Sequence, residues 1–278
     1  MSIRDLVHGA AERLKAAGVD SARLDARILL AHAMGVGHEE LIAATHEPSA
    51  EQAALFDYFV VRRAAREPIA YIRGKREFWS LDFKVGPGVL VPRPETETLI
   101  EVALDLVPDR NAGFSLADLG AGSGALLIAA LKEFPQAQGI GFERSPEALV
   151  YAYANLARHD LTGRAEIIAA DWHDAVGAFD LILSNPPYIP TADIQTLDPE
   201  VRSHEPLTAL DGGADGLNAY RGLAALLPAL LKPGGWALLE LGQGQAADVE
   251  PLFQRLEVVR VAPDLAGIPR VLVLKSPK

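Results

Sequence analysis

The spacing of apolar residues predicts a helical unit at the start of the chain. From Ser2 to Ala17, apolar residues recur every three or four positions, which is the period of an amphipathic helix, and Gly18 follows as a stop. The same pattern predicts a second helix from Ser21 to Met34 and a third from Ser49 to Arg66. We therefore expect residues 1–75 to form a small all-helical domain.

A different pattern follows this unit. Between Phe78 and Pro92, short apolar stretches lie on either side of Gly86-Pro87-Gly88, and such residues are typical of a turn between two strands. We expect residues 76–93 to form a β-hairpin linker that turns at these three residues.

From about residue 95, predicted helices alternate with predicted strands. This alternation is typical of a mostly parallel sheet with helices on both faces, so we expect residues 94–278 to form an α/β domain. Ligands of such sheets bind beyond the carboxyl ends of the strands. The predicted helices cover about 95–107, 124–134, 146–158 and 217–231, and the predicted strands cover 115–119, 139–142, 165–170, 179–184 and 236–241.

Composition and charge exclude several classes of protein. The 278-residue chain is 49% hydrophobic and has no cysteine, which excludes disulfides, thiolate metal sites and a cysteine nucleophile. The formal net charge is −11, and residues 1–75 hold ten basic and ten acidic side chains, so the acidic excess belongs to the remainder. We expect no stable binding of nucleic acid, which depends on cationic contacts to phosphates.

Location and metal binding follow from two further patterns. Charge appears at once, at Arg4 and Asp5, and no apolar run approaches the ~18–20 residues that cross a bilayer. We expect a cytoplasmic protein that does not attach to membranes and acts as a monomer. The seven histidines have no metal-ligand spacing, so we expect no metal.

A glycine-rich segment after the first predicted strand indicates a cofactor site. The strand ends in Asp118-Leu119, and the loop that follows holds Gly120, Ala121, Gly122, Ser123 and Gly124 before an apolar helix. Glycines allow the backbone to turn sharply and approach a ligand closely. The loop fits the G-x-G-x-x-A pattern of a dinucleotide site, but a carboxylate just before it would repel a pyrophosphate and suits the amino group of S-adenosylmethionine. Both cofactors remain open at this point.

Three more residues lie where parallel strands end. Glu143 ends the second predicted strand, and its two carboxylate oxygens could accept hydrogen bonds from both ribose hydroxyls. Asp171 and Trp172 follow the third predicted strand and could contact adenine, the acid through its exocyclic amine and the indole through apolar area. Trp172 could equally belong to the core.

The fourth predicted strand ends in Asn185-Pro186-Pro187-Tyr188. Two prolines make this turn rigid, because they fix φ and restrict the preceding residue. Such a turn suits a planar NH₂ group: the Asn185 side-chain oxygen and the Pro186 carbonyl can each accept one hydrogen, while Tyr188 covers the flat face. We predict that these four residues bind and orient an amide or amine for methyl transfer, and that Asn185 also contacts the cofactor.

With these motifs, the chain resembles the HemK/PrmC family, the release-factor glutamine methyltransferases, over nearly its full length. The resemblance implies a class I S-adenosylmethionine-dependent methyltransferase fold, Rossmann-like, with a seven-stranded, mostly parallel sheet whose last strand is antiparallel. Glu143 departs from the family, which more often has Asp there, and Ala121 is a milder change. The matching stretches are Phe78-Trp79, Pro92-Arg93-Pro94-Glu95-Thr96-Glu97, Asp118 to Gly124, Asn185 to Tyr188, Glu205-Pro206-Leu207-Thr208-Ala209-Leu210 and Ala266-Gly267-Ile268-Pro269-Arg270-Val271.

The resemblance also implies the reaction. The substrate would be the glutamine of the Gly-Gly-Gln motif in class I peptide chain release factors, methylated on its side-chain amide, with S-adenosylhomocysteine as the product and a role in translation termination. Residues 1–75 would then recognise the substrate protein. Three alternatives remain: a glutamine methyltransferase acting on a ribosomal protein, a DNA adenine methyltransferase, which the acidic charge disfavours, and an inactive adaptor, which would not need Asp118 or Asn185.

Overall fold

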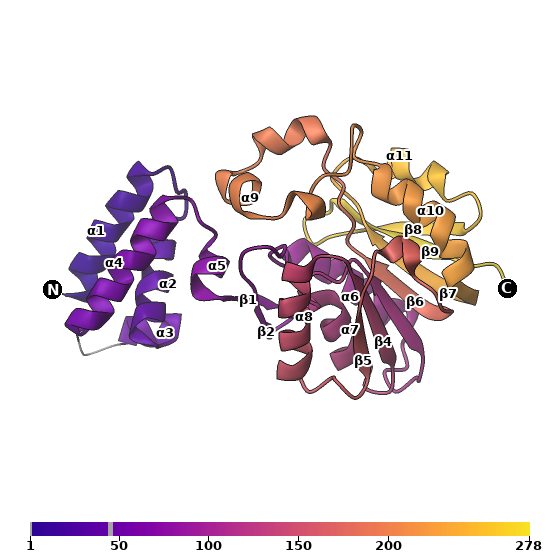
Figure 1. The fold of residues 1–278 in the computed structure, drawn as a ribbon, viewed down its shortest axis with the longest axis horizontal. Coiled ribbons are helices and arrows are strands. Elements are labelled where there is room, and N and C mark those ends of the chain that lie inside the picture. Colours follow the sequence, from indigo (N-terminus) through magenta and orange to yellow (C-terminus); the bar gives the residue numbers. More distant parts are fainter. Residues whose placement is uncertain (1, 44–46) are drawn as a thin grey trace. The chain divides into compact units, whose positions relative to one another are not determined.

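The computed structural model describes residues 2–43 and 47–278. The chain divides into two compact units. The first consists of Met1–Lys75 with the short segment Asp198–His204, and the second consists of Arg76–Leu197 with Glu205–Lys278 (Figure 1). No helix in the described part of the chain is both long and apolar enough to cross a membrane.

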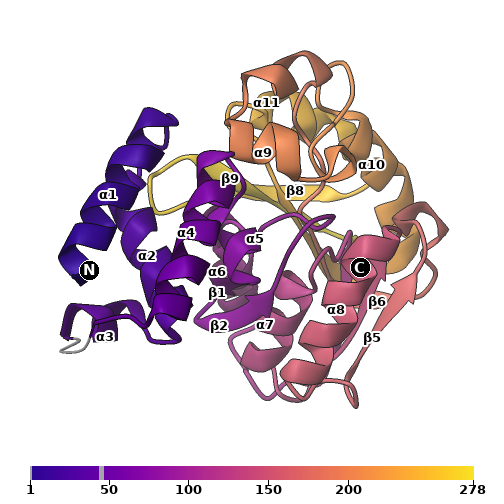
Figure 2. The ribbon, with the colours of Figure 1, turned by 60° about the vertical axis from the view of Figure 1, so that its left-hand side comes forward.

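The first unit is helical, and α1, α2 and α4 lie side by side in it (Figure 2). Several ends of these helices have the signals that the sequence predicts, but Ser21, the expected N-cap of α2, makes no side-chain capping hydrogen bond. Ser2 and Ser49 cap α1 and α4 with their side chains, and Gly35 ends α2 in the left-handed conformation with a φ of 72°. Its helices are α1 (Ile3–Ala16), α2 (Ala22–Met34), α3 (His38–Ala43), α4 (Ala50–Ala64), α5 (Ile69–Arg73) and α9 (Pro199–His204).

A buried group of charges holds α9 in the helical unit. Arg63 Nε donates to Asp25 Oδ2 at 2.7 Å, and Arg63 Nη2 lies 2.7 Å from Glu200 Oε1. Arg66 also pairs with Glu200, through Nε at 2.8 Å and Nη2 at 2.6 Å. Glu200 comes from a segment more than a hundred residues further along the chain, so no local pattern could assign that segment to this unit.

The two-stranded hairpin turns at a place that the sequence did not predict. Strands β1 (Lys75–Phe78) and β2 (Leu81–Lys84) are joined by Trp79 and Ser80, with φ values of 51° and 56°. The expected turn at Gly86-Pro87-Gly88 is therefore wrong, because these residues follow the second strand. A two-residue turn with positive φ at both positions matches the twist of paired strands.

Trp79 keeps this unusual conformation through its contacts. Its backbone N–H donates to Glu97 Oε1 at 2.8 Å, and its indole N–H donates to Glu133 Oε1 at 2.7 Å. These two hydrogen bonds offset the strain that a bulky residue has at positive φ. The known preferences of such turns favour glycine or asparagine. For this reason Gly86-Pro87-Gly88 has a stronger turn signal in the sequence than Trp79 and Ser80.

The second unit has a seven-stranded sheet in the order β5-β4-β3-β6-β7-β9-β8. The first five strands of this order pair in parallel, and β9 is antiparallel to both β7 and β8. The predicted fold class is confirmed. The strands are β3 (Ser115–Leu119), β4 (Gln138–Glu143), β5 (Ala165–Ala169), β6 (Phe179–Ser184), β7 (Leu231–Glu240), β8 (Glu257–Pro263) and β9 (Pro269–Lys275).

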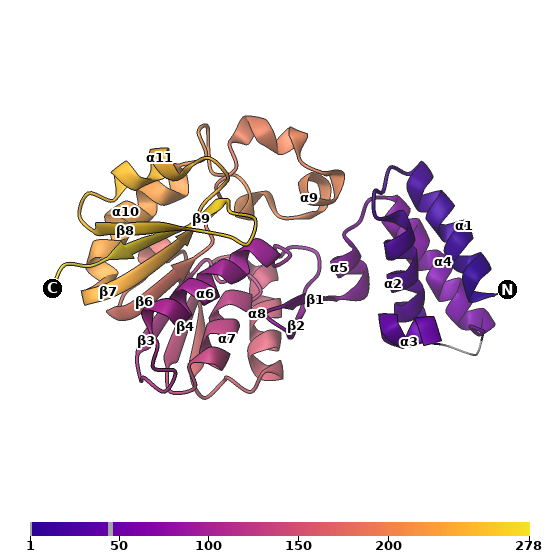
Figure 3. The same ribbon diagram turned by 180° about the vertical axis from the view of Figure 1, so that it is seen from behind.

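Helices cover both faces of this sheet, and each face has its own core. Side chains of α6, α7 and α8 pack on one face, and those of α10 and α11 pack on the other. Figure 3 shows β8 and β9 extending the sheet beyond β7. The remaining helices are η1 (Pro94–Thr96), α6 (Glu97–Leu106), α7 (Ala125–Glu133), α8 (Pro146–Arg158), η2 (Trp172–Asp174), η3 (Thr191–Thr196), η4 (Leu207–Ala209), α10 (Asn218–Leu230), α11 (Ala246–Val249) and η5 (Glu250–Leu252).

Removal of the buried guanidinium should destabilise the helical unit. Arg63→Ala leaves the carboxylates of Asp25 and Glu200 with less compensation, and we expect the free energy of unfolding to fall by about 3 kcal/mol. The control is Arg13→Ala, because Arg13 pairs with Asp57 at the surface and both side chains are about half exposed or more. That change should cost less than about 1 kcal/mol. Urea unfolding of the whole chain measures both, and equal effects would contradict a structural role for the buried group.

Candidate active site

A pocket of about 710 Å³ lies beyond the carboxyl ends of β3, β4, β5 and β6. Its size is within the range of small-molecule sites. It lies where the strand order reverses, because the chain passes from β3 to β4 and β5 and returns to β6 on the other side of β3. Ten predicted site residues line it: Asp118, Gly120, Ala121, Gly122, Ser123, Glu143, Asp171, Trp172, Asn185 and Pro187.

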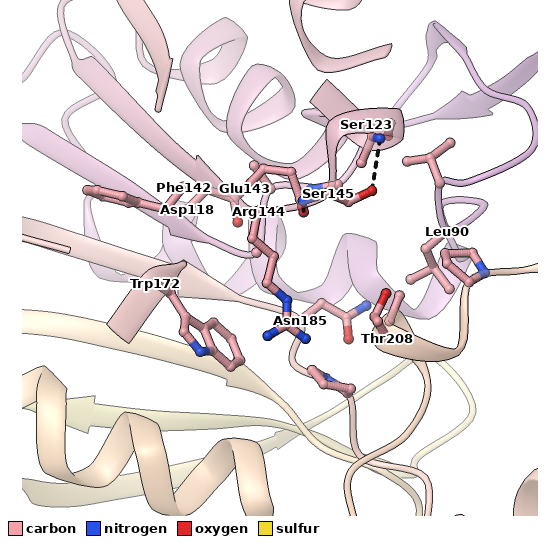
Figure 4. Close-up of a pocket in the computed structure, with 18 of the residues that line it drawn as sticks. Leu90, Asp118, Ser123, Phe142, Glu143, Arg144, Ser145, Trp172, Asn185 and Thr208 are labelled. Atoms are coloured by element: carbon pink, nitrogen blue, oxygen red, sulfur yellow. Dashed lines mark hydrogen bonds between the residues drawn. The ribbon is translucent and has the colours of Figure 1, made fainter. Parts of the chain in front are cut away.

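Figure 4 shows side chains from separate strand ends around this pocket. Glu143 and Arg144 come from the end of β4, Trp172 from the segment after β5, and Asn185 from the end of β6. Gly124, Pro186 and Tyr188 do not line it in this structure. The predicted roles of the individual site residues stay predictions.

The glycine loop has the backbone conformation that its sequence predicts. Gly120, Gly122 and Gly124 have φ values of 86°, 56° and 79°, which a residue with a Cβ adopts at a cost. A Cβ at Gly122 would meet no atom within 4 Å, so that position faces open space. A Cβ at Gly120 would lie 3.8 Å from the ring of Trp172. The loop backbone is therefore accessible to a ligand beside the indole.

Asp118 provides a buried carboxyl group beside this loop. It is 1% exposed, and its Oδ2 accepts a hydrogen bond from the Leu127 N–H at 3.2 Å. Burial raises the pKa of Asp118 to about 7, and the charge of Glu143 acts in the same direction against the effect of that hydrogen bond. A cationic ligand would favour the ionised form, so the residue suits a positively charged group.

Glu143 holds the loop in place. Its Oε2 accepts from the Gly122 N–H at 2.8 Å, and its Oε1 accepts from the Ser145 N–H at 2.7 Å. Each carboxylate oxygen has a second lone pair for another donor. The longer acid at this position is thus compatible with the predicted contact to ribose hydroxyls, and it has a structural task as well.

Asp171 forms hydrogen bonds with Arg144 and His173. Arg144 Nη1 donates to its Oδ2 at 2.9 Å, and the backbone N–H and ring of His173 bond to its Oδ1 at 3.0 and 2.6 Å. Burial acts to raise the pKa of Asp171, but these hydrogen bonds outweigh it and keep the pKa below its ordinary value. Trp172 both lines the pocket and packs against the core beneath the sheet.

The Asn-Pro-Pro-Tyr turn directs its two polar side chains differently. Asn185 lines the pocket, and its Nδ2 donates to Thr96 Oγ1 at 3.0 Å, which leaves its Oδ1 for another donor. Tyr188 has its hydroxyl 3.2 Å from Glu240 Oε1, and burial raises its pKa. In this structure the tyrosine therefore hydrogen-bonds to a buried acid, although the sequence predicted that it covers the flat face of the substrate.

The pocket also has walls for which sequence reasoning gave no role. Glu205 is buried, and its carboxylate accepts from the Val91 N–H at 3.1 Å and from Arg93 Nη2 at 2.5 Å. These two hydrogen bonds join the segment before η1 to the segment that carries Thr208, which lines the pocket. Thr96 and Thr208 both lie in stretches that carry the family resemblance, and that was the available signal. Arg144 had none.

Comparison with known proteins identifies the family. A model of the PrmC N-terminal domain matches residues 5–74, and a model of the methyltransferase small domain matches residues 97–197. A release factor glutamine methyltransferase of Caulobacter vibrioides is 46% identical over 274 residues, which are 96% of this chain and 94% of that protein. The chain belongs to the release factor glutamine methyltransferase family. Another member, from Rhodospirillum rubrum, is 45% identical and covers 97% of this chain and 84% of its own length.

A solved structure agrees at the level of fold. A methyltransferase from Pyrococcus furiosus has a TM-score of 0.52 at 19% identity, covering 80% of this chain and 98% of its own. Membership of the release factor glutamine methyltransferase family confirms the predicted resemblance and the methyltransferase class. It decides the choice of cofactor in favour of S-adenosylmethionine, so the dinucleotide interpretation is not supported.

Asp118 should make the stability of the fold depend on pH. The folded protein keeps a proton there up to pH about 7, whereas a solvated aspartic acid loses it near pH ~4. Unfolding therefore releases this proton between those values, and the free energy of unfolding falls as the pH rises from about 4 to 7. Asp118→Asn removes this term, so its stability relative to the wild type should rise by on the order of 3 kcal/mol between pH 4 and pH 8.

Urea unfolding at a series of pH values measures this difference. The control is Asp248→Asn, because Asp248 is exposed in α11. That variant should follow the wild-type pH profile. Parallel profiles for the wild type and Asp118→Asn would overturn the assignment of a buried, neutral carboxyl group at this position.

Proposed function

We propose that this protein transfers a methyl group from S-adenosylmethionine to the side-chain amide nitrogen of the glutamine in the Gly-Gly-Gln motif of class I peptide chain release factors. The observation that carries this is the placement of Asn185 on the same pocket as the glycine loop and Asp118, with its carbonyl oxygen available. The curated relatives from two bacteria are release factor glutamine methyltransferases, which supports the same reaction.

The residues of the pocket fit S-adenosylmethionine. Asp118 would face the amino group, the backbone of the glycine loop would lie against the methionine portion, Glu143 would accept from the ribose hydroxyls, and Trp172 would contact the adenine. The open space at Gly122 and the buried acid beside the loop are the observations that support this fit. S-adenosylmethionine supplies an electrophilic methyl group on a positively charged sulfur.

The chain's own contribution is to hold the amide of the substrate. An amide nitrogen is a weak nucleophile because its lone pair is delocalised, so the site must fix it in line with the methyl group. Asn185 Oδ1 and the carbonyl of Pro186 would accept its two N–H hydrogens. These hydrogen bonds would orient the nitrogen and stabilise the positive charge that develops on it as the new bond forms. The nitrogen then loses one proton, for which water is a sufficient acceptor.

A ribosomal protein as substrate is the second candidate, because it would present the same glutamine amide to the same residues. The curated relatives favour the release factor. Action on DNA is disfavoured by the acidic charge of residues 76–278. The monomeric state, the cytoplasmic location and the lack of stable nucleic-acid binding stay predictions.

We also propose that the helical unit recognises the body of the release factor. Its α4 presents Leu55, Tyr58 and Val61 at three-residue spacing, and they are 43%, 56% and 52% exposed. Apolar side chains that recur on one exposed helix face suit contact with a protein partner. The match of residues 5–74 to the PrmC N-terminal domain supports a dedicated role for this unit.

Labelling tests the reaction and the role of Asn185 together. The protein is incubated with methyl-labelled S-adenosylmethionine and, in separate reactions, a class I release factor, ribosomal proteins and duplex DNA. We expect label on the Gly-Gly-Gln glutamine alone. Asn185→Ala should lower this transfer by on the order of 100-fold or more, because the amide is no longer held, while cofactor affinity changes by only several-fold.

The matched control is Asn111→Ala, which changes an exposed asparagine in the loop before β3 and should leave transfer unchanged. Label on a ribosomal protein instead would support the second candidate. Full turnover by Asn185→Ala would contradict the role given to that side chain.

Kinetics test the helical unit. Replacement of Leu55, Tyr58 and Val61 by serine should raise KM for intact release factor by about 10-fold, since each removes apolar contact area, and leave kcat nearly unchanged. Activity on a short Gly-Gly-Gln peptide should not change. The control is Leu265→Ser, which alters an equally apolar, 96% exposed side chain of the second unit. An unchanged KM for the intact factor would exclude this face of α4 from recognition.

A further inference from the structure

A buried ion pair joins two segments of the pocket wall. Its members are Glu205, whose side chain is 1% exposed, and Arg93, whose side chain is 32% exposed. Glu205 Oε1 accepts from Arg93 Nη2 at 2.5 Å, and its Oε2 accepts from the Val91 N–H at 3.1 Å. Neither member of the pair lines the pocket. A charge is costly to bury unless its partners compensate for it, so the segments that this pair joins indicate its purpose.

The two segments form the wall beside Asn185. Both belong to the second unit; one leads into η1, and the other contains η4. Figure 4 shows Leu90 of the first segment and Thr208 of the second near Asn185, on the side away from Trp172. The ion pair therefore lies on the side of the pocket where Asn185 would hold the substrate amide, and not on the side predicted for adenine.

The first segment leads from Arg93 to Asn185 in three residues. Prolines lie on both sides of Arg93, which is extended, with a φ of −99° and a ψ of 144°. The single turn of η1 follows, in which the Thr96 N–H donates to the Arg93 carbonyl at 3.2 Å. Thr96 Oγ1 then accepts from Asn185 Nδ2 at 3.0 Å. The position of the Thr96 hydroxyl thus depends on where Glu205 holds Arg93.

The second segment leads from Glu205 to the other end of the Asn-Pro-Pro-Tyr turn. Ile189 comes directly after this turn, and its N–H donates to the Leu210 carbonyl at 3.0 Å. The Ile189 carbonyl accepts from the Gly212 N–H at 2.8 Å. Both ends of the turn are therefore held by neighbouring segments, and Glu205 is the residue at which these two segments are tied to each other.

We propose that Glu205 is a positioning residue, which ties together the two supports of the turn and so sets where Asn185 Oδ1 meets the substrate amide. This inference rests on the proposed function, because it takes Asn185 Oδ1 as the acceptor of an N–H of that amide. Methyl transfer requires the nitrogen in line with the methyl group, and a displacement of about 1 Å lowers a rate by on the order of 100-fold. Glu205 would thus affect the rate without touching either substrate.

A glutamine at this position tests the role of the carboxylate. The two oxygens of Glu205 accept from two donors, whereas Glu205→Gln has one oxygen and must turn its NH₂ group toward the other donor. We expect kcat for the release factor to fall by on the order of 30-fold, while the affinity for S-adenosylmethionine changes less than threefold. Steady-state labelling and calorimetric titration measure the two quantities. A wild-type kcat in this variant would overturn the proposal.

The arginine provides a second test that does not depend on how the glutamine variant folds. Arg93→Ala keeps the bond from Val91 and lets water reach the carboxylate, so we expect a smaller fall in kcat, about 10-fold. Arg93→Lys keeps a cationic donor and should stay within about threefold of the wild type. Equal kcat values for the alanine and lysine variants would contradict a role for this ion pair.

The matched control is Arg110→Ala. Arg110 pairs with Glu133 at 2.6 Å in the same unit, and neither residue lines the pocket. This change removes an arginine–glutamate pair away from Asn185 and should leave kcat unchanged. A loss of kcat equal to that of Arg93→Ala would show a general effect of a lost ion pair and would overturn the proposal.

Combination with Asn185→Ala separates positioning from general support of the fold. If Glu205 acts through Asn185, its replacement has little further effect once that side chain is absent, because residues that act as a unit are not additive. The double variant Asn185→Ala with Glu205→Gln should therefore keep the kcat of Asn185→Ala to within about threefold, measured by single-turnover labelling. Two effects that multiply would contradict the positioning role alone. If the wild-type protein does not methylate a release factor, the proposed function and this role both fail.

Discussion

The parallel pairing of β3 with β6 is the constraint on which the active site depends. The chain places β4 and β5 on one side of β3 before it reaches β6 on the other side. The segments that follow β3 and β6 therefore lead away from their strand ends in opposite directions. Asp118 pairs with Leu183 in the register, and the Ser184 hydroxyl donates to the Leu119 carbonyl at 2.6 Å. The glycine loop and the Asn-Pro-Pro-Tyr turn begin side by side for this reason.

Two buried acids with similar surroundings have different tasks around this junction. Burial brings the pKa of both Asp118 and Glu240 to about 7. Asp118 lines the pocket, where a positively charged ligand can compensate its charge. Glu240 does not line the pocket, and its Oε1 accepts a hydrogen bond from the Tyr188 hydroxyl. Asp118 is thus placed where it can contact a ligand, whereas Glu240 is placed where it contacts the protein itself.

Local sequence was a good guide wherever a short stretch determines its own structure. Helices α1, α2 and α4 lie where the apolar period placed them, with Ser2 and Ser49 capping α1 and α4, and the strands that lead to Asp118 and Asn185 lie where continuous apolar runs placed them. Short signals failed where a distant contact overrode them. The hairpin turns at Trp79 because carboxylates from α6 and α7 hold it there, although Gly86 to Gly88 has the stronger local turn signal.

The sequence by itself determined the family, the α/β class, the glycine loop and the asparagine turn, because each depends on residues that are neighbours in the chain. Only the tertiary structure decided that Asp198–His204 belongs with the helices, that Tyr188 contacts a buried acid, and that Asn185 donates to Thr96. Those relations join residues about fifty to more than a hundred positions apart. Their geometry arises when strands pair and side chains exclude water, and no local pattern of residues encodes it.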